Sequence, residues 1–259
     1  MITNKRIKEL TMMNQKSKAR REEHAFLAEG IKMFMEAPTD RIREIYVSES
    51  FLAEGACKEK MEKCGYETVP AEVFKKITDT MTPQGILCVI DRKEYTLADM
   101  LTASHPLLMV LEELQDPGNL GTIIRTGEGA GVNGVIMSKG CVDIYNPKTI
   151  RSTMGSIYRI PFFYTDDLHK TMKELKENQV SLYAAHLRGE KMYDEISYWR
   201  ENHGTAFLIG NEGNGLTDEI ADMADIYLKI PMQGQIESLN AGIASAVLMY
   251  EAYRQYRNR

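Results

Sequence analysis

Three short stretches of the 259-residue chain combine glycine with amide, hydroxyl and charged side chains. They read NLGTIIRT (119–126), FLIGNEGNGL (207–216) and IPMQGQIESLN (230–240). Arginine can hold a phosphate, carboxylate and amide groups can orient a hydroxyl, and glycines let the backbone approach a flat ligand. The five histidines and four cysteines show no HExxH or CxxC spacing, so we expect no metal site. If these stretches bind a ligand, we therefore expect it to be something other than a metal ion.

Each stretch also has an ordinary structural interpretation. Asn119 is well placed to cap a helix that is closed by Gly131. The glycines at 210–215 suit a plain turn, and Ser238 or Asn240 suits the cap of the last helix. The residues alone leave both interpretations open.

A GxGxxG pattern, GAGVNG at 129–134, raises the alternative of a nucleotide-dependent oxidoreductase. A dinucleotide fingerprint follows a strand and opens a helix. Here the pattern follows a helical stretch and opens the apolar segment GVIM. The order is reversed, so this alternative is disfavoured.

From residue 107 onward, continuous apolar segments alternate with helical ones, which is typical of a parallel sheet covered on both faces. The expected strands are LLMVLEEL (107–114), GVIMSKG, IPFFYTD, SLYAAHL, TAFLIGNEG and IYLKIPM. Ligands of such sheets bind beyond the carboxyl ends of the strands. The three polar stretches follow strands, so we expect them to face one ligand.

The N-terminal part of the chain has its own alternation of helices and strands. A helical segment over 5–37 precedes strand-like segments at 42–50 and 85–92, with short helices between them. We therefore predict an α/β protein with two domains, at residues 1–96 and 105–259.

Composition limits where the protein works. No run of about 18 apolar residues is present, which predicts no membrane span. The N-terminus lacks the apolar core of a secretion signal. The cysteine spacing is typical of free thiols in a reducing compartment. We predict a cytoplasmic protein.

Charge is distributed unevenly along the chain. The formal net charge is −5, yet residues 1–21 hold seven basic side chains and one acidic one. Such an arm can bind phosphate, and an amphipathic solvated helix is the alternative. The candidates for contact with RNA are Lys16, Lys18, Arg20 and Arg21.

Taken together, the three polar stretches resemble the three motifs of the SpoU (TrmH) family of RNA ribose 2′-O-methyltransferases. NLGTIIRT is similar to the first motif, LIGNEGNGL to the second and IPMQGQIESLNAGIASAVLMYE to the third, in the family's order and spacing. Near the N-terminus, ARREEHAFLAEGIKMFMEA and TDTMTPQGILCVI resemble the family's substrate-binding domain, a small α/β module similar to ribosomal RNA-binding proteins. The resemblance covers nearly the whole chain.

The resemblance implies an S-adenosylmethionine cofactor, a homodimer in which the partner completes each active site, and a deep trefoil knot in the C-terminal domain. The residues expected to line the cofactor are Leu187, Gly210, Asn211, Glu212, Gly213, Ile230, Met232, Ser238 and Leu239. The residues expected to serve catalysis are Arg125, Asn119, Glu212, Ser238 and Asn240. Arg151 is a further candidate for contact with RNA or with the partner.

The implied reaction transfers a methyl group to a ribose 2′-hydroxyl. Arg125 matches the family's proposed base, but a guanidinium holds its proton in proteins. We therefore expect Arg125 to anchor the target phosphate and polarise the hydroxyl. Large-subunit (23S) rRNA is the favoured substrate, because the N-terminal domain is similar to those of rRNA-directed members. A tRNA methyltransferase and a non-catalytic RNA-binding or ribosome-assembly factor are the alternatives.

Overall fold

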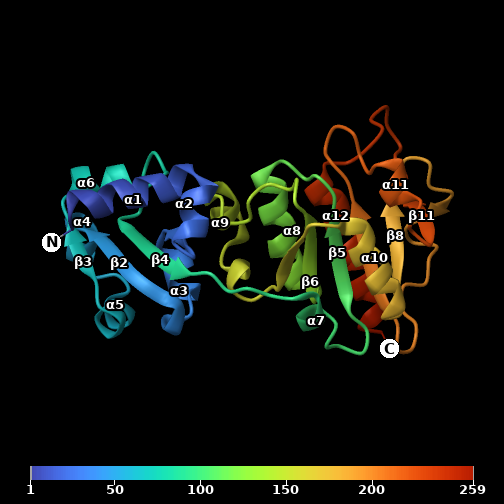
Figure 1. The fold of residues 1–259 in the computed structure, drawn as a ribbon, viewed down its shortest axis with the longest axis horizontal. Helices are drawn as coiled ribbons and strands as arrows, with labels where there is room; N and C mark the ends of the chain where they lie inside the picture. The colour runs from blue at the N-terminus through green and yellow to red at the C-terminus, as the bar shows by residue number, and fades with distance from the viewer. Residues whose placement is uncertain (1, 259) are drawn as a thin grey trace. The chain divides into compact units, whose positions relative to one another are not determined.

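The computed structural model of the protein describes residues 2–258. The chain divides into two compact units, each with its own sheet (Figure 1). The first unit comprises residues 1–93 and 143–158, and the second comprises residues 94–142 and 159–259. A segment from the middle of the chain thus belongs to the N-terminal unit, which the sequence did not indicate. Within the described residues, every helix is too short or too polar to cross a bilayer.

The first unit is built on a mixed four-stranded sheet in the order β1-β4-β2-β3. Its strands are β1 (Ala25–Glu29), β2 (Ile42–Ser48), β3 (Glu67–Val69) and β4 (Ile86–Asp91). Strand β4 is antiparallel to β1 and β2, whereas β2 and β3 are parallel. Its helical elements are α1 (Asn4–Gln15), α2 (Ser17–Glu22), α3 (Ile31–Glu36), η1 (Thr39–Arg41), α4 (Glu49–Glu54), α5 (Lys58–Cys64), α6 (Ala71–Ile77), α9 (Pro147–Thr153) and η2 (Ser156–Tyr158).

The helix expected over 5–37 is wrong in its second half, where AFLAE forms strand β1. Phe26 pairs with Ile90 of β4, and the first four residues of the strand are buried. Gly30, with φ of 101°, then turns the chain into α3. A short apolar run suits a buried helix or a buried strand, and here the pairing with the distant β4 decides it.

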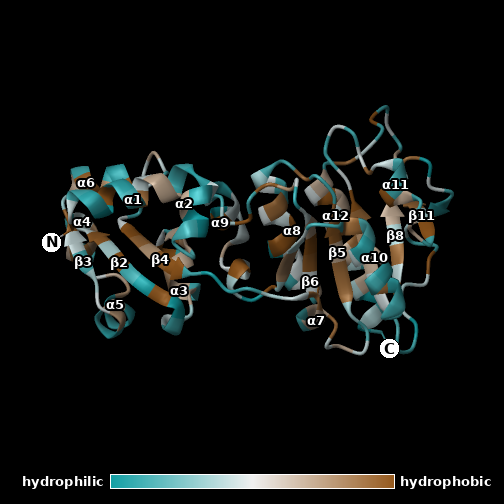
Figure 2. Ribbon diagram, in the orientation of Figure 1, coloured by the Kyte–Doolittle hydropathy of each residue, from teal (hydrophilic) through white to brown (hydrophobic). Residues whose placement is uncertain are grey.

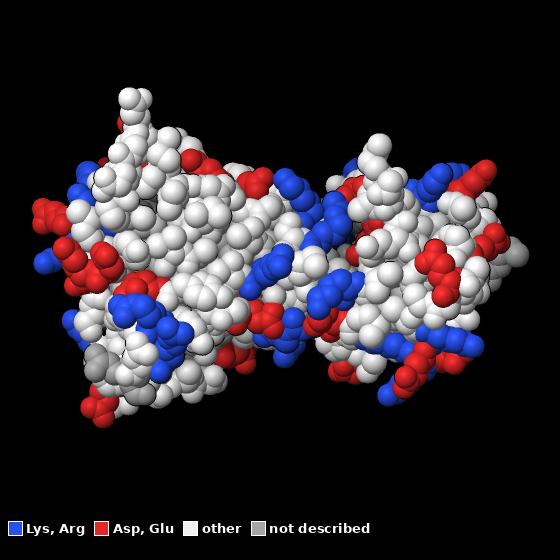
Figure 3. Space-filling model, turned by 180° about the vertical axis from the view of Figure 1, so that it is seen from behind, with Lys and Arg blue, Asp and Glu red and all other residues white. Residues whose placement is uncertain are grey.

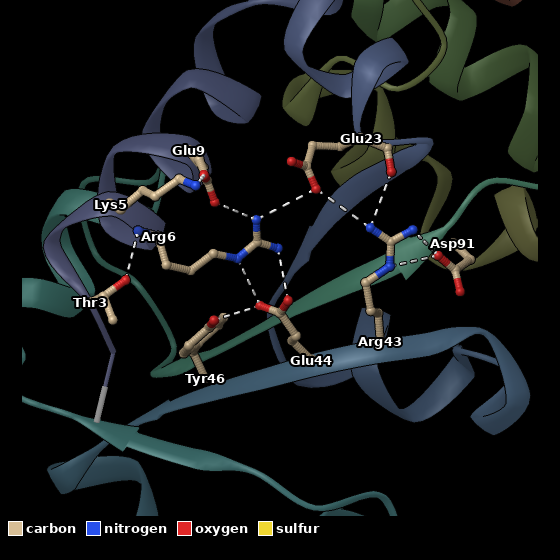
Figure 4. A network of polar contacts seen from close by, with 9 residues as sticks. All are labelled: Thr3, Lys5, Arg6, Glu9, Glu23, Arg43, Glu44, Tyr46 and Asp91. Atoms are coloured by element: carbon tan, nitrogen blue, oxygen red, sulfur yellow. Dashed lines mark hydrogen bonds and ion pairs between the residues drawn. The ribbon is translucent and has the colours of Figure 1, made fainter.

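Part of the basic N-terminal arm is used to hold α1 on the sheet (Figure 4). Arg6 donates to both carboxylate oxygens of Glu44, at 2.9 and 3.1 Å, and to Glu9 at 3.0 Å. Tyr46 donates to the same Glu44 carboxylate at 2.5 Å. The Arg6 side chain is 17% exposed. Arg6 therefore stabilises the fold and is not part of an open basic surface.

The inserted segment packs into the first unit through aromatic and polar contacts. The rings of Phe26 and Tyr145 stack with centroids 4.8 Å apart, and Tyr158 donates its hydroxyl to the carbonyl of Met33 at 3.1 Å. Arg20 donates to Asp143 Oδ2 at 2.6 and 3.0 Å and also to backbone carbonyls of α1. This Arg20 side chain is 4% exposed, so it joins the segment to the unit.

We expect Arg20→Ala to lower the free energy of unfolding by about 3 kcal/mol, because it leaves a partly buried carboxylate and backbone carbonyls without donors. Arg21→Ala is the matched control, since Arg21 is exposed and its own replacement should cost under about 0.5 kcal/mol. Urea unfolding followed by circular dichroism gives both values. Equal losses in the two variants would contradict the structural role of Arg20.

The second unit is built on a seven-stranded sheet in the order β7-β6-β5-β10-β8-β11-β9, and every pairing in it is parallel. Its strands are β5 (Leu107–Leu111), β6 (Gly134–Ser138), β7 (Phe162–Thr165), β8 (Val180–Ala185), β9 (Lys191–Met192), β10 (Gly204–Ile209) and β11 (Ile226–Lys229). Its helices are α7 (Leu97–Met100), α8 (Pro117–Ala130), α10 (Leu168–Glu177), α11 (Asp218–Ala221) and α12 (Ala241–Tyr256). The predicted parallel sheet is confirmed.

Helices cover both faces of this sheet, whose central strands are strongly apolar (Figure 2). Helices α7, α10 and α11 share one core with the strands. Helix α12 lies behind the sheet in Figure 1 and packs against α8. Two glycines of α8 face this contact: a Cβ on Gly127 would lie 3.7 Å from Met249 Sδ, and one on Gly129 would lie 3.1 Å from the hydroxyl of Tyr250. Their small size lets the two helices approach closely.

Candidate active site

A cavity of about 540 Å³ opens where β8, β10 and β11 end. Its walls are the residues directly after these strands and the loop that leads into α12. All of the predicted cofactor residues line it, namely Leu187, Gly210, Asn211, Glu212, Gly213, Ile230, Met232, Ser238 and Leu239. The polar stretches therefore meet at the carboxyl edge of the sheet, as expected for a ligand site of this architecture.

The glycine-rich segment after β10 forms a tight turn against the cavity. Asn211 and Gly215 exchange backbone hydrogen bonds of 3.0 and 2.8 Å. The Asn211 side chain accepts from the amides of Gly213 and Asn214. A Cβ on Gly210 would lie 2.1 Å from the carbonyl carbon of Gly215, so only glycine fits there. The turn thus presents backbone groups, with few side chains, to the cavity.

Glu212 links this turn to the loop between β5 and α8. Its carboxylate accepts from Asn119 Nδ2 at 2.9 Å, from the amide of Gln115 at 3.0 Å and from the amide of Asp116 at 2.9 Å. Partial burial works to raise the pKa of Glu212, but these hydrogen bonds outweigh it and hold the pKa below its usual range. Glu212 is therefore an ionised clamp between the first and second motifs.

Asn119 is not the helix cap that the sequence allowed. Helix α8 begins at Pro117, and Asp116 caps it by accepting from the amide of Asn119 at 2.8 Å. Proline suits the first helical position, which needs no amide donor, and this moves the start two residues upstream of Asn119. The Asn119 side chain is free to bond Glu212. At the other end of α8, Gly131 closes the helix as expected, with φ of 75°.

The sequence offered Ser238 or Asn240 as the cap of the last helix, and the structure assigns this role to Asn240. Asn240 caps the helix by accepting from the amides of Gly242 and Ile243, at 2.9 and 3.2 Å. Ser238 is exposed and lines the cavity beside Glu237. The cap thus explains Asn240, and the neighbouring polar side chains remain directed to the ligand space.

Arg125 lies apart from the residues that line the cavity. It is exposed on α8, and among the described residues its guanidinium has no hydrogen-bond or ion-pair partner. One chain therefore brings Glu212, Ser238 and Asn240 to the cavity and joins Asn119 to them through Glu212, but it leaves Arg125 outside.

The structure places the five predicted RNA contacts in three different settings. Lys16, Lys18 and Arg21 are exposed in the first unit. Arg20 is buried, so its assignment as an RNA contact is corrected by its bonds to Asp143. Arg151 lies in the inserted segment and pairs with Asp79 at 2.9 Å.

His186 is a cavity residue that the sequence analysis missed. Its ring stacks on Tyr227 at 5.3 Å, and its Nδ1 accepts from the amide of Arg188 at 3.1 Å. Burial, followed by the charge of Arg188, lowers the pKa of His186. This acceptor role leaves Nε2 to carry the proton of the neutral ring. The sequence feature that could have identified His186 is its position at the end of an expected strand, next to Leu187.

The profile of the SpoU rRNA methylase family matches residues 106–250, and that of the MRM3-like substrate-binding domain matches residues 4–88. The first match spans more than half of the chain. The protein belongs to the SpoU rRNA methylase family. The predicted family, and with it the prediction of a methyltransferase enzyme, is confirmed.

Relatives of this SpoU family member include enzymes named for ribosomal RNA. It is 38% identical over 179 residues to the 23S rRNA (guanosine(2553)-2′-O)-methyltransferase RlmP of Bacillus subtilis, which covers 69% of this chain and 68% of that protein. An AdoMet-bound rRNA methyltransferase from Sinorhizobium meliloti superposes with a TM-score of 0.83 at 30% identity, covering 98% and 96% of the chains. AviRb from Streptomyces viridochromogenes, at 22% identity, shares the fold with a TM-score of 0.85 over 99% of both chains.

Proposed function

We propose that the protein transfers the methyl group of S-adenosylmethionine to a ribose 2′-hydroxyl of 23S rRNA. The observation that carries the proposal is the cavity, whose walls are built by the second and third SpoU motifs. Family membership, the rRNA target in the name of the Bacillus subtilis relative and the AdoMet-bound neighbour support the cofactor and the substrate class. Such a substrate is met in the cytoplasm.

The cavity suits S-adenosylmethionine in size and in chemistry. Sites for ligands of this size occupy about 300–1,000 Å³ and combine apolar walls with a few polar groups. Here Leu187, Ile230 and Leu239 supply apolar walls, and the tight turn at Gly210 supplies backbone donors and acceptors. When bound, the cofactor supplies an activated methyl group, so the protein has mainly to position the acceptor.

Different residues of the chain would then bind the RNA and orient the ribose for methyl transfer. Arg125 holds the phosphate next to the target ribose and polarises its 2′-hydroxyl. Glu212 fixes Asn119 and the turn before α8, which sets the wall of the ribose site. Ser238, exposed at the cavity, is placed to bond the ribose or the cofactor.

A homodimer would bring Arg125 of one protomer to the cavity of the other. The isolated chain leaves Arg125 outside its own cavity lining. On the unit that carries the C-terminus, the face seen in Figure 3 has a broad area without charged side chains. Helix α12 exposes Ile243 at 50%, Tyr250 at 49% and Tyr253 at 37%. An exposed apolar stripe of this kind is typical of an interface between subunits.

The same unit would contain the trefoil knot implied by the family. Two strands, β10 and β8, separate β11 from β5 in the sheet, yet α12, the helix that follows β11, packs against α8, which follows β5. The chain between them, residues 230–240, runs past the turn after β10. Threading of α12 through that loop would build the cavity from segments that are distant in sequence.

The exposed basic residues of the N-terminal arm would bind the RNA backbone. We expect replacement of Lys16, Lys18 and Arg21 by alanine to weaken rRNA binding about tenfold and to reduce its salt dependence, since about three phosphate contacts are lost. Filter binding at several salt concentrations measures both effects. Replacement of the exposed Lys170 and Lys173 in the second unit is the control. If the salt dependence of rRNA binding did not change, the basic N-terminal arm would be a solvated helix that does not contact RNA.

Methyl transfer with two RNA substrates tests the proposed function. Labelled S-adenosylmethionine is supplied with unmodified 23S rRNA or with unmodified tRNA. We expect label in rRNA. Label in tRNA alone would favour a tRNA methyltransferase, and binding of RNA without binding of the cofactor would favour a non-catalytic factor.

A further inference from the structure

A buried carboxylate, Glu112, holds the segment that lines the cavity in addition to the exposed Glu212. Glu112 follows β5 directly and is 7% exposed. It lies outside the residues that line the cavity and in none of the polar stretches that resemble the family motifs. A buried carboxylate is costly unless donors satisfy it. The hydrogen-bond donors that satisfy Glu112 therefore indicate its structural role.

Both oxygens of Glu112 are bonded to one residue. Oε2 accepts from the amide of Thr217 at 2.8 Å, and Oε1 accepts from its hydroxyl at 2.7 Å. The Thr217 hydroxyl accepts in turn from the amide of Ile220 and so caps α11. Thr217 is thus fixed on both sides.

Thr217 ends the segment whose backbone forms one wall of the cavity. That wall is Gly210–Leu216, and β10 anchors its beginning. Glu212 ties its middle to the β5–α8 loop, and Glu112, reaching from that same loop, ties its end. The segment is rich in glycine, so few side chains restrict it and a small set of hydrogen bonds decides its shape.

We propose that Glu112 is a positioning residue for the cofactor, which acts through Thr217 to hold the glycine-rich wall in its binding shape. The inference rests on the proposed function. A wall fixed in advance loses less conformational freedom when a ligand binds, so Glu112 contributes to affinity. It touches no reacting atom, so it contributes little to the rate once the site is filled.

The test compares Glu112→Gln with Thr217→Val, which removes the hydroxyl bond to Glu112 together with the cap of α11, and with Thr217→Ser, which keeps both. We expect a tenfold rise in the Kd for S-adenosylmethionine by calorimetry for Glu112→Gln, and a smaller rise for Thr217→Val. Thr217→Ser should bind like the wild type. At saturating cofactor, kcat should change less than twofold. If Glu112→Gln does not fold, Thr217→Val and Thr217→Ser still decide the matter.

Glu251→Gln is the matched control, because Glu251 is also buried and hydrogen-bonded but its partners, Arg254 and Gln255, lie on α12. An unchanged Kd in both Glu112→Gln and Thr217→Val would overturn the inference, as would an equal rise in Glu251→Gln. Failure of the wild type to bind S-adenosylmethionine would instead overturn the proposed function.

Discussion

Replacement of Arg125 by alanine should abolish methyl transfer while binding of S-adenosylmethionine survives. We expect kcat to fall at least about 1,000-fold, because loss of one well-placed donor to the developing charge costs on the order of 100- to 1,000-fold and the anchor for the phosphate goes with it. Arg125 lies outside the cavity lining, so the Kd for the cofactor should stay within twofold of the wild-type value. Single-turnover kinetics and calorimetry measure the two quantities.

Arg159→Ala is a useful control for the loss of an exposed arginine from the same unit, since Arg159 pairs with Glu128 of α8. We expect it to retain transfer. Near-normal turnover in Arg125→Ala would show that Arg125 does not take part in catalysis. Loss of cofactor binding in that variant would show that Arg125 acts in cofactor binding instead.

Replacement of Glu212 by alanine should lower both cofactor affinity and turnover. Three donors, the Asn119 side chain and the amides of Gln115 and Asp116, would lose their shared acceptor. Hydrogen bonds to an ionised group contribute about 1.5–3 kcal/mol each, so we expect kcat/KM to fall at least about 100-fold. Steady-state kinetics over a range of cofactor concentrations measures it. A loss confined to kcat would show that Glu212 contacts the target ribose and does not position the loops that bind the cofactor.

The lowered pKa of Glu212 gives this prediction a pH dependence. The ionised carboxylate contributes stability that is present above the ordinary glutamate pKa of 4.5 and is lost as the pH falls through the lower, folded-state pKa. The difference in unfolding free energy between the wild type and Glu212→Gln should be constant above pH 4.5 and shrink below it. A difference that grows as the pH falls would contradict the clamp.

The two alanine variants together test the shared site. In a purified heterodimer of Arg125→Ala and Glu212→Ala protomers, one site would carry both changes and the other neither, if Arg125 acts on the partner's cavity. We then expect about half of the wild-type activity per dimer. If Arg125 serves its own chain, each site carries one change and the heterodimer stays inactive.

Much of the second unit could be predicted because its signals are local. Long apolar runs between helices predict a parallel sheet, and the polar residues that follow them must meet at one edge. The glycines of the segment after β10 were predicted to allow close approach, and Gly210 shows why no side chain fits there. The full set of cofactor residues came instead from the family resemblance, and all of them line the cavity.

The rest depends on contacts between residues that are distant in sequence. AFLAE is a strand because β4 pairs with it. Arg20 is buried because Asp143 arrives from the inserted segment. Neither partner is visible in the local pattern. Likewise, Asp116 takes the cap of α8 because Pro117 starts the helix early, which frees Asn119 for Glu212.

The most direct test of the central claim asks which atom of the RNA receives the methyl group. 23S rRNA labelled by the protein and S-adenosylmethionine is hydrolysed in alkali, which cleaves next to every free 2′-hydroxyl. We predict that the label is recovered in one alkali-resistant dinucleotide, because methylation of the 2′-oxygen blocks cleavage at that ribose. Label recovered only in mononucleotides would place the methyl group on a base and would contradict the assignment.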